Sequence, residues 1–198
     1  IGLSKEYIDS VDTNNYFVDA KFIKPIVKRR KRFSHKGDYG HGLLIGGSYG
    51  KMGALILSAK AALRSGIGLL TVSTAKCGYN ILQTSVPEAM ITTSTNDCFV
   101  DNIQTDYSRY SAIGIGPGLG TEKVTFPVLE KILRTAKCPI VIDADGINII
   151  AQNKNILEEV RFNNQYPLIL TPHLKEFERL FGETNGYEDR YNKLITNS

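Results

Sequence analysis

The sequence predicts an α/β fold with a mostly parallel central sheet and helices on both faces. Short apolar runs of strand length alternate with segments of helical periodicity from about residue 36 onward. Unusual turns rich in Gly, Asp or Pro follow four of these runs. A length of 198 residues with 42% hydrophobic residues is enough for one domain with a sizeable core. Together these observations indicate successive βαβ units.

The elements follow from these runs in chain order. Residues 1–35 are polar and weakly patterned, so we expect a linker with some local helix, followed by a domain over 36–198. The helix over 54–64 is apolar on most sides and is expected to be largely buried. Strands are predicted at 42–45, 69–73, 89–93, 112–115, 140–142 and 168–170, and the clearest helices at 54–64, 78–85, 123–135 and 175–181.

Composition limits the class of protein. The cysteines, Cys77, Cys98 and Cys138, lie far apart without a Cys-x-x-Cys pair, which argues against a disulfide framework and a cysteine-based zinc site. A reducing, cytoplasmic location fits this best. No apolar stretch is long enough to span a bilayer, so no membrane partner is predicted.

The positive charge is local. The formal net charge is +4, and the run Lys28-Arg29-Arg30-Lys31-Arg32 alone supplies five positive charges, so the remainder carries −1. No aromatic residues are interleaved with this run, which favours a solvated linker over a nucleic-acid interface.

The four unusual turns should share the carboxyl edge of the sheet, where doubly wound folds bind ligands. They are 46–53, 116–120, 143–146 and 171–173. In the first, a strand leads through a glycine turn into a helix, which directs N–H groups toward an anion. A Walker A loop is excluded because Ile45 and Met52 occupy positions that require Gly and Ser or Thr. The alternative is an ordinary strand-to-helix turn.

The other turns carry the remaining candidates. Gly116, Gly118 and Gly120 would let the backbone approach a nucleotide or sugar, although a plain turn is the alternative. Asp143 could bind Mg²⁺ or take a proton, with Asn148 nearby as a further ligand. Asp145 could instead cap the helix that follows.

The turn at 171–173 predicts a helix start. Thr171 is expected at the N-cap, Pro172 at the first helical position, and His173 in the first turn as a neutral hydrogen-bonding group. A surface histidine is the alternative. His35 and His41 do not match metal-ligand spacing and are expected to be structural or exposed.

Several of these motifs, in this order and spacing, are similar to one known family. From about Ser34 to the end the chain resembles the ADP/ATP-dependent NAD(P)H-hydrate dehydratases of the ribokinase-like superfamily. The segments that carry the resemblance are 35–40, Gly46-Gly47-Ser48 with Gly53-Ala54, 59–68, Pro87-Glu88-Ala89, 115–120, 143–148 and 170–177.

The resemblance implies an enzyme that removes water from the S epimer of hydrated NADH or NADPH while ADP or ATP, with Mg²⁺, loses its terminal phosphate. Phosphorylation would turn the hydroxyl into a better leaving group. It also implies a homo-oligomer. The residues that it places against the hydrated dinucleotide are Ala54, Gly116, Gly118, Gly120, His173, Glu176 and Arg179.

The chain departs from the family at its ends. Members continue beyond the position of Ser198 into a Gly-x-Gly-Asp turn whose Asp is the presumed base, so we expect a fold that is incomplete at the C-terminal end and a fragment that is inactive by itself. The first residues resemble the end of the epimerase domain of bifunctional members. The alternatives are a small-molecule kinase of the same superfamily and a non-catalytic nucleotide-binding module.

Overall fold

The computed structural model describes residues 2–12, 17–27, 29–163 and 165–198, and at 161–163 only the backbone. Lys28 of the basic run is therefore outside the described residues. The chain divides into two compact units, Ile1–Ser34 and His35–Ser198. The first contains two short helices, α1 (Lys5–Ser10) and α2 (Ala20–Ile23), capped by the side chains of Ser4 and Asp19. The local helix expected in this segment is thus present.

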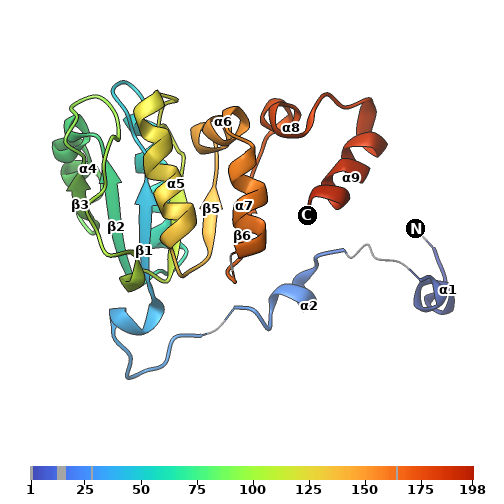
Figure 1. Cartoon of the computed structure of the whole chain (residues 1–198). Coiled ribbons are helices and arrows are strands. Elements are labelled where there is room, and N and C mark those ends of the chain that lie inside the picture. Colours follow the sequence, from blue (N-terminus) through green and yellow to red (C-terminus); the bar gives the residue numbers. More distant parts are fainter. Residues whose placement is uncertain (1, 13–16, 28, 164) are drawn as a thin grey trace. The chain divides into compact units, whose positions relative to one another are not determined.

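The second unit is built on a six-stranded sheet with the order β3-β2-β1-β4-β5-β6. All its strand pairs are parallel, so the arrows in Figure 1 run the same way. Each strand agrees with its prediction to within about one residue. The strands are β1 (His41–Ile45), β2 (Leu69–Thr74), β3 (Met90–Thr93), β4 (Ala112–Ile115), β5 (Ile140–Ile142) and β6 (Leu168–Leu170).

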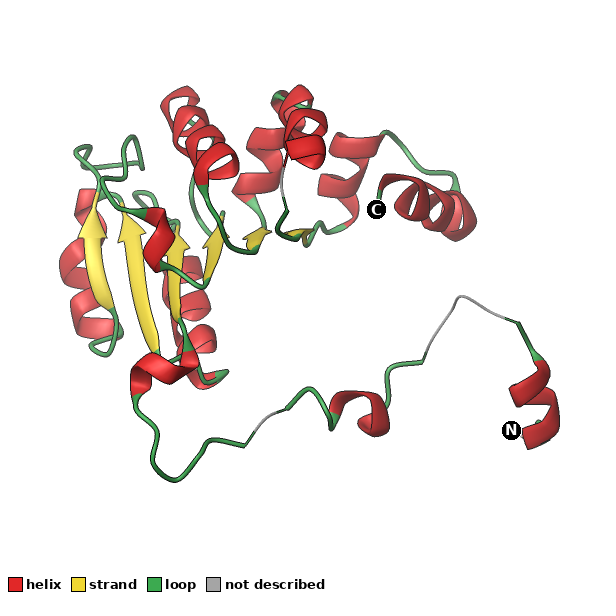
Figure 2. Ribbon diagram, turned by 60° about the horizontal axis from the view of Figure 1, so that its bottom comes forward, coloured by secondary structure: helices red, strands yellow, loops and turns green. Residues whose placement is uncertain are grey.

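Helices cover both faces of this sheet, as predicted (Figure 2). Alternate residues of β1 enter different cores: Leu44 packs with residues of α3 and α4, whereas Leu43 and Ile45 pack with residues of α5, α6 and α7. The α-helices are α3 (Met52–Arg64), α4 (Tyr79–Ser85), α5 (Phe126–Thr135), α6 (Asp145–Gln152), α7 (Asn155–Asn163), α8 (Leu174–Phe181) and α9 (Gly186–Asn197). Short 3-10 turns are η1 (Lys36–Tyr39), η2 (Lys76–Gly78), η3 (Tyr107–Arg109) and η4 (Lys123–Thr125).

The expectation that the helix over 54–64 is largely buried was wrong. In α3 only Met52, Leu55 and Ala59 are buried, and these lie on the stripe that faces the sheet. Leu57, on another side of the helix, is 71% exposed. The apolar residues outside the stripe have no layer above them in the described chain, which periodicity could not reveal.

Two further helices were not predicted. In α7 the buried residues Ile156 and Val160 are four apart and form one apolar stripe. In α9 no residue is buried, and Tyr187 is 88% exposed, so the hydrophobic pattern gave no signal there.

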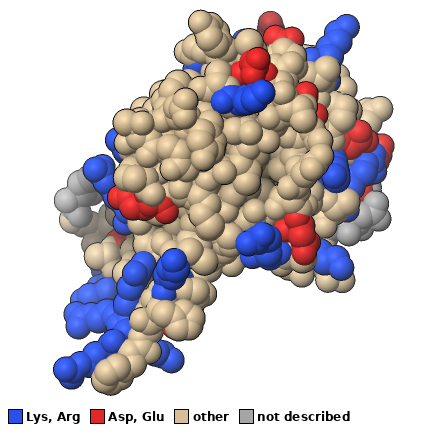
Figure 3. All heavy atoms as spheres, turned by 90° about the vertical axis from the view of Figure 1, so that its left-hand side faces the viewer, with Lys and Arg blue, Asp and Glu red and all other residues tan. Residues whose placement is uncertain are grey.

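The surface of the second unit has an open apolar side chain at one edge strand and a mixed distribution of charge. Ile169 of the edge strand β6 is 49% exposed, so one face of that strand is open to solvent. On the face in Figure 3, charged side chains of both signs lie around an uncharged centre. Within the described residues, no helix has the length and apolar character needed to cross a bilayer.

Candidate functional site

The strand order reverses between two glycine-rich turns. The chain leaves β1, forms β2 and β3 on one side, and then returns to place β4 on the other side of β1. The turns that follow β1 and β4 therefore flank the point where the strand order reverses. This is the position at which doubly wound sheets bind their ligands.

These two turns are bonded to each other. The backbone N–H of Gly47 donates to the carbonyl of Pro117 at 3.0 Å. The buried hydroxyl of Ser48 donates to the carbonyl of Gly118 at 2.9 Å. The turns consequently form one continuous wall at the carboxyl edge.

Close packing within the chain explains several of the glycines. A Cβ atom at Gly46 would lie 2.3 Å from the carbonyl oxygen of Pro117, and one at Gly118 would lie 2.3 Å from that of Lys51. At Gly116, where φ is +130°, a Cβ would lie 1.8 Å from the oxygen of Asp143. Sequence reasoning assigned such glycines to ligand approach, but these positions already require glycine for the contact between loops.

Open space remains at the start of α3. A Cβ added at Gly50 or Gly53 would meet nothing within 4 Å. Ala54 is exposed in the first turn of α3, and no side chain caps that helix. The N–H groups of this first turn therefore lack a side-chain partner.

Asp145 joins three of the loops. Its Oδ2 atom accepts from the backbone N–H of Gly120 at 2.9 Å and from Nζ of Lys51 at 3.1 Å. The prediction that Asp145 caps α6 was wrong: Ala144 occupies the N-cap position, with φ of +47°, and Asp145 is the first helical residue. The backbone turns sharply at Ala144, which frees the carboxylate to reach across to the other loops.

The loops after β5 and β6 are also connected. The hydroxyl of Thr171 donates to Oδ1 of Asp143 at 2.8 Å. Asn148, which sequence reasoning placed near a metal, accepts through Oδ1 from Nη1 of Arg179 on α8. Among the described residues, no group of three or more His, Cys, Asp or Glu side chains could hold a metal ion.

His173 begins α8 differently from the prediction. It is itself the N-cap residue, whereas Thr171 and Pro172 precede the helix. Its Nδ1 accepts from the backbone N–H groups of Lys175 and Glu176, at 3.1 and 3.4 Å. The carboxylate of Glu176 accepts from the backbone N–H of His173 at 3.0 Å and lies 3.1 Å from Nε2. The imidazole therefore contacts the helix backbone through Nδ1 and the carboxylate of Glu176 through Nε2.

The remaining histidines have structural positions, as predicted. His35 caps η1 and pairs with Asp38, in the same arrangement as His173 with Glu176. His41 is half-buried at the start of β1, where its Nε2 lies 2.8 Å from the hydroxyl of Thr71. Neither lies on the turns of the carboxyl edge.

The structure thus brings most predicted residues into one connected series. A hydrogen bond links the turn at 116–120 to Asp145, and another links Asn148 to Arg179. Ala54 lies one helical turn after Lys51. Sequence reasoning missed Lys51 and Ser48. The sequence around Gly50-Lys51 fails the Walker A pattern and gives no sign that Lys51 contacts Asp145, which is 94 residues away.

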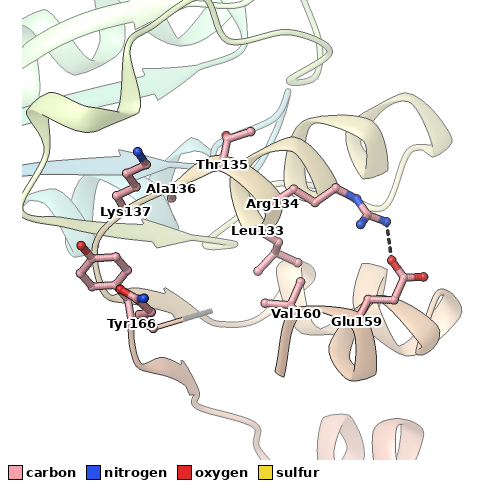
Figure 4. Close-up of a pocket in the computed structure, with 9 residues that line it drawn as sticks. Leu133, Arg134, Thr135, Ala136, Lys137, Glu159, Val160 and Tyr166 are labelled. Carbon is pink, nitrogen blue, oxygen red and sulfur yellow. Dashed lines mark hydrogen bonds and ion pairs between the residues drawn. The ribbon is translucent and has the colours of Figure 1, made fainter. Parts of the chain in front are cut away.

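A hollow of about 610 Å³ lies at the opposite edge of the sheet, before β5 and β6 (Figure 4). It is lined by residues 133–137, Glu159, Val160, Gln165 and Tyr166. Its most prominent cation, Arg134, already contacts Glu130 and Glu159. Because ligands of such sheets bind at the carboxyl edge, we place the candidate site at the glycine turns instead.

Comparison with known proteins identifies the family. The family model described as NAD(P)H-hydrate dehydratase matches residues 42–196, which include every turn of the candidate site. The chain belongs to the NAD(P)H-hydrate dehydratase family. The resemblance carried by the sequence motifs is confirmed.

One curated member of the NAD(P)H-hydrate dehydratase family is the bifunctional NAD(P)H-hydrate repair enzyme Nnr of Coxiella burnetii. It is 36% identical over 182 residues, which is 92% of this chain and 35% of that protein. The chain therefore spans about a third of this relative's length.

Solved structures agree with the ribokinase-like α/β fold. A ribokinase-like superfamily protein from Enterococcus faecalis matches with a TM-score of 0.73 and 27% identity, over 93% of this chain and 66% of that one. The ADP/ATP-dependent NAD(P)H-hydrate dehydratase of Bacillus subtilis, co-crystallised with ATP/Mg²⁺, matches with a TM-score of 0.70 and 29% identity. That match covers 86% of this chain and 57% of the other.

Proposed function

We propose that this chain forms the substrate-binding part of an enzyme that dehydrates the S epimer of hydrated NADH or NADPH at the expense of ADP or ATP. The observation that carries the proposal is the wall of two interlocked glycine turns at the strand-order reversal, in a chain whose family model is that of NAD(P)H-hydrate dehydratase. Doubly wound sheets bind dinucleotides at this reversal of strand order.

Each loop has a distinct role in this proposal. The uncapped first turn of α3, around Ala54, offers N–H groups to a phosphate of the dinucleotide. The backbone of Gly118 and Gly120 approaches the substrate, and the exposed side chains of His173 and Arg179 bind its polar groups. Glu176 is buried, so it acts by holding the imidazole of His173 in position.

Mg²⁺ enters with the phosphate donor. Asp143 is a partly exposed carboxylate at this edge, but the amide oxygen of Asn148 is already used by Arg179. This donor set fits an ion held by one carboxylate and by nucleotide phosphates, which is common for Mg²⁺, better than a cage made by protein alone. The bound ion would offset the charge of the phosphates. The residues of this chain bind and orient the substrate, and we assign no proton transfer to them.

The proposal extends to a linked domain, the cellular location and the oligomeric state. The bifunctional name of the Coxiella burnetii relative supports a covalently linked epimerase domain. We further propose a cytoplasmic homo-oligomer. Light scattering after size exclusion measures the molar mass in solution. A monomer at micromolar concentration would contradict the proposed homo-oligomer.

The deciding experiment is an assay of the longest form of the protein that the gene encodes. Hydrated NADH or NADPH is given with ADP or ATP and Mg²⁺, and the absorbance of the reduced nicotinamide is followed. Recovery that requires the nucleotide supports the proposal. If the hydrate persists while an added thiazole, pyridoxal or sugar alcohol becomes phosphorylated, the enzyme is a small-molecule kinase instead.

A further inference from the structure

Two cysteines that are distant in sequence come together beside the first glycine turn. Cys77 lies in η2, directly after β2, and is partly buried, whereas Cys98 is exposed on the loop at 94–101. The third cysteine, Cys138, is buried. In the sequence the three cysteines lie far apart, without a Cys-x-x-Cys pair.

The loop that carries Cys98 is held in a defined shape. The amide oxygen of Asn96 accepts from the backbone N–H of Cys98 at 2.8 Å. The carboxylate of Asp101 accepts from the N–H groups of Thr95 and Asn96, and from the hydroxyl of Thr95. Cys98 is therefore placed by short-range bonds and is not at the end of an unrestrained loop.

Two backbone bonds fix this loop against η2. The N–H of Lys76 donates to the carbonyl of Asn96, and that of Cys77 donates to the carbonyl of Asp97, both at 3.0 Å. The carbonyl of Asp97 is one peptide bond from Cys98, so standard bond lengths hold the Cα atoms of Cys77 and Cys98 within about 7 Å. Disulfides join Cα atoms about 4.4–6.8 Å apart, so the separation of this pair is compatible with a bridge.

Cys98 is close enough to Cys77 to affect its titration. Burial raises the pKa of the Cys77 thiol, and the neighbouring Cys98 and Asp97 raise that pKa further. Cys77 therefore stays mainly protonated near neutral pH. Cys98 is the more accessible nucleophile of the two.

We propose that Cys77 and Cys98 form an oxidisable dithiol that takes hydrogen peroxide as its oxidant and closes to an intramolecular disulfide. The sulfur of Cys98 attacks one peroxide oxygen, the O–O bond breaks, and a sulfenic acid and one water result. The sulfur of Cys77 then attacks the sulfenic sulfur, the S–O bond breaks, and the second water leaves. Two thiols are oxidised, and one peroxide is reduced to two waters.

The dithiol is coupled to the candidate site. The carbonyl of Cys98 accepts from the backbone N–H of Tyr49 at 2.8 Å, and Tyr49 belongs to the glycine turn after β1. A bond from Cys98 to Cys77 would tie that turn more firmly to the end of β2. This inference concerns the chain's own thiols and does not depend on the proposed function.

Peptide mapping of the reduced 198-residue chain after brief exposure to hydrogen peroxide tests the proposal. Trypsin should release both cysteines in one peptide, 77–109, because no Lys or Arg lies between these ends. In the oxidised sample this peptide should weigh two hydrogens less and should resist alkylation until dithiothreitol is added. Cleavage after Glu88 places the two cysteines in separate peptides, which should remain joined without reductant.

Two variants test the separate roles of Cys98 and Cys77, and Cys138 serves as an internal control. Cys98→Ser should abolish the cross-link, whereas Cys77→Ser should leave a sulfenic acid at Cys98 that dimedone traps. Cys138, buried in the same molecule, should stay unmodified over the same interval. Over-oxidation of Cys98 without a cross-link, disulfides between chains only, or equal oxidation of Cys138 would overturn the proposal. Hydrogen exchange at the Tyr49 amide should slow on oxidation, and an unchanged rate would refute the coupling.

Discussion

The Nζ atom of Lys51 lies 3.1 Å from Oδ2 of Asp145, and the same oxygen accepts a hydrogen bond from the backbone of Gly120. This contact joins the turns that follow β1, β4 and β5 at a single carboxylate. Lys51 remains half exposed, with 53% of its side chain accessible, whereas the side chain of Asp145 is 18% accessible. Asp145 is therefore the more buried member of the pair, and its carboxylate makes both of the contacts between the loops.

Replacing Asp145 should destabilise the loops of the carboxyl edge. Asp145→Ala leaves the N–H of Gly120 without its acceptor and should lower the free energy of unfolding by about 1–3 kcal/mol. Asp145→Asn keeps an acceptor and should cost less. Urea denaturation followed by circular dichroism measures both. Asp97→Ala, which removes a 3.9 Å exposed pair with Lys76, is the matched control and should change stability by less than about 1 kcal/mol. Equal losses in all three variants would contradict this role.

A side chain at position 116 should be poorly tolerated. In Gly116→Ala the new Cβ would collide with the carbonyl of Asp143 at a positive φ, so we expect a loss of more than about 3 kcal/mol or failure to fold. Gly53→Ala is the control, because its Cβ would enter open space in α3 and should leave stability unchanged or raise it by up to about 1 kcal/mol. Soluble yield and urea midpoints compare the two. A stable Gly116→Ala variant would show that the loops can separate at little cost.

His173 can be tested for capping and for substrate binding separately. His173→Ala removes the N-cap of α8 and should cost about 1 kcal/mol, whereas His173→Asn supplies another good N-cap residue and should retain most of the stability. If the imidazole also binds the hydrated dinucleotide, as proposed, both variants should bind it more weakly by calorimetry. Wild-type binding by the Asn variant would limit His173 to its capping role.

The stability of the chain should depend on pH through His41. Burial and, secondarily, the charge of Arg109 lower the pKa of His41 in the folded state. The folded chain thus favours the neutral imidazole, which lies 2.8 Å from the hydroxyl of Thr71 and packs edge-on against Tyr110. This contribution is present above the ordinary histidine pKa of about 6.5 and is lost as the pH falls through the lowered value.

Urea midpoints of the wild-type chain should therefore decrease between about pH 7 and pH 5, and the decrease should be smaller in His41→Gln. The glutamine can still bond to Thr71 but does not titrate. Parallel curves for the two proteins would exclude His41 as the source of the dependence.

The strands and the edge that carries the site were predictable because they depend on local signals. Apolar runs such as 112–115 and 140–142 are continuous in sequence, and parallel order places the turns after them together. The bond between Lys51 and Asp145 was not predictable, since it joins positions 94 residues apart. Nor was the cap at His173, because Thr171 and Pro172 gave a stronger sequence signal for a helix start than a histidine does.

Exposure was the least predictable property. The composition of α3 is apolar around most of its circumference, but only neighbouring layers decide which side is covered, as the exposed Leu57 shows. The same holds for Cys77 and Cys98, whose proximity arises from two backbone bonds between η2 and a distant loop.

The interlocking of the two glycine turns has a consequence for how this protein can evolve. Gly46 packs so closely against the carbonyl of Pro117, and Gly118 against that of Lys51, that neither position has room for a Cβ atom. The backbone path of each turn therefore depends on that of the other. A substitution that adds a side chain in one turn requires a matching change of path in its neighbour. We therefore expect lineages to alter the two turns as a pair, and a designer who wishes to rebuild this edge of the sheet to exchange both segments together.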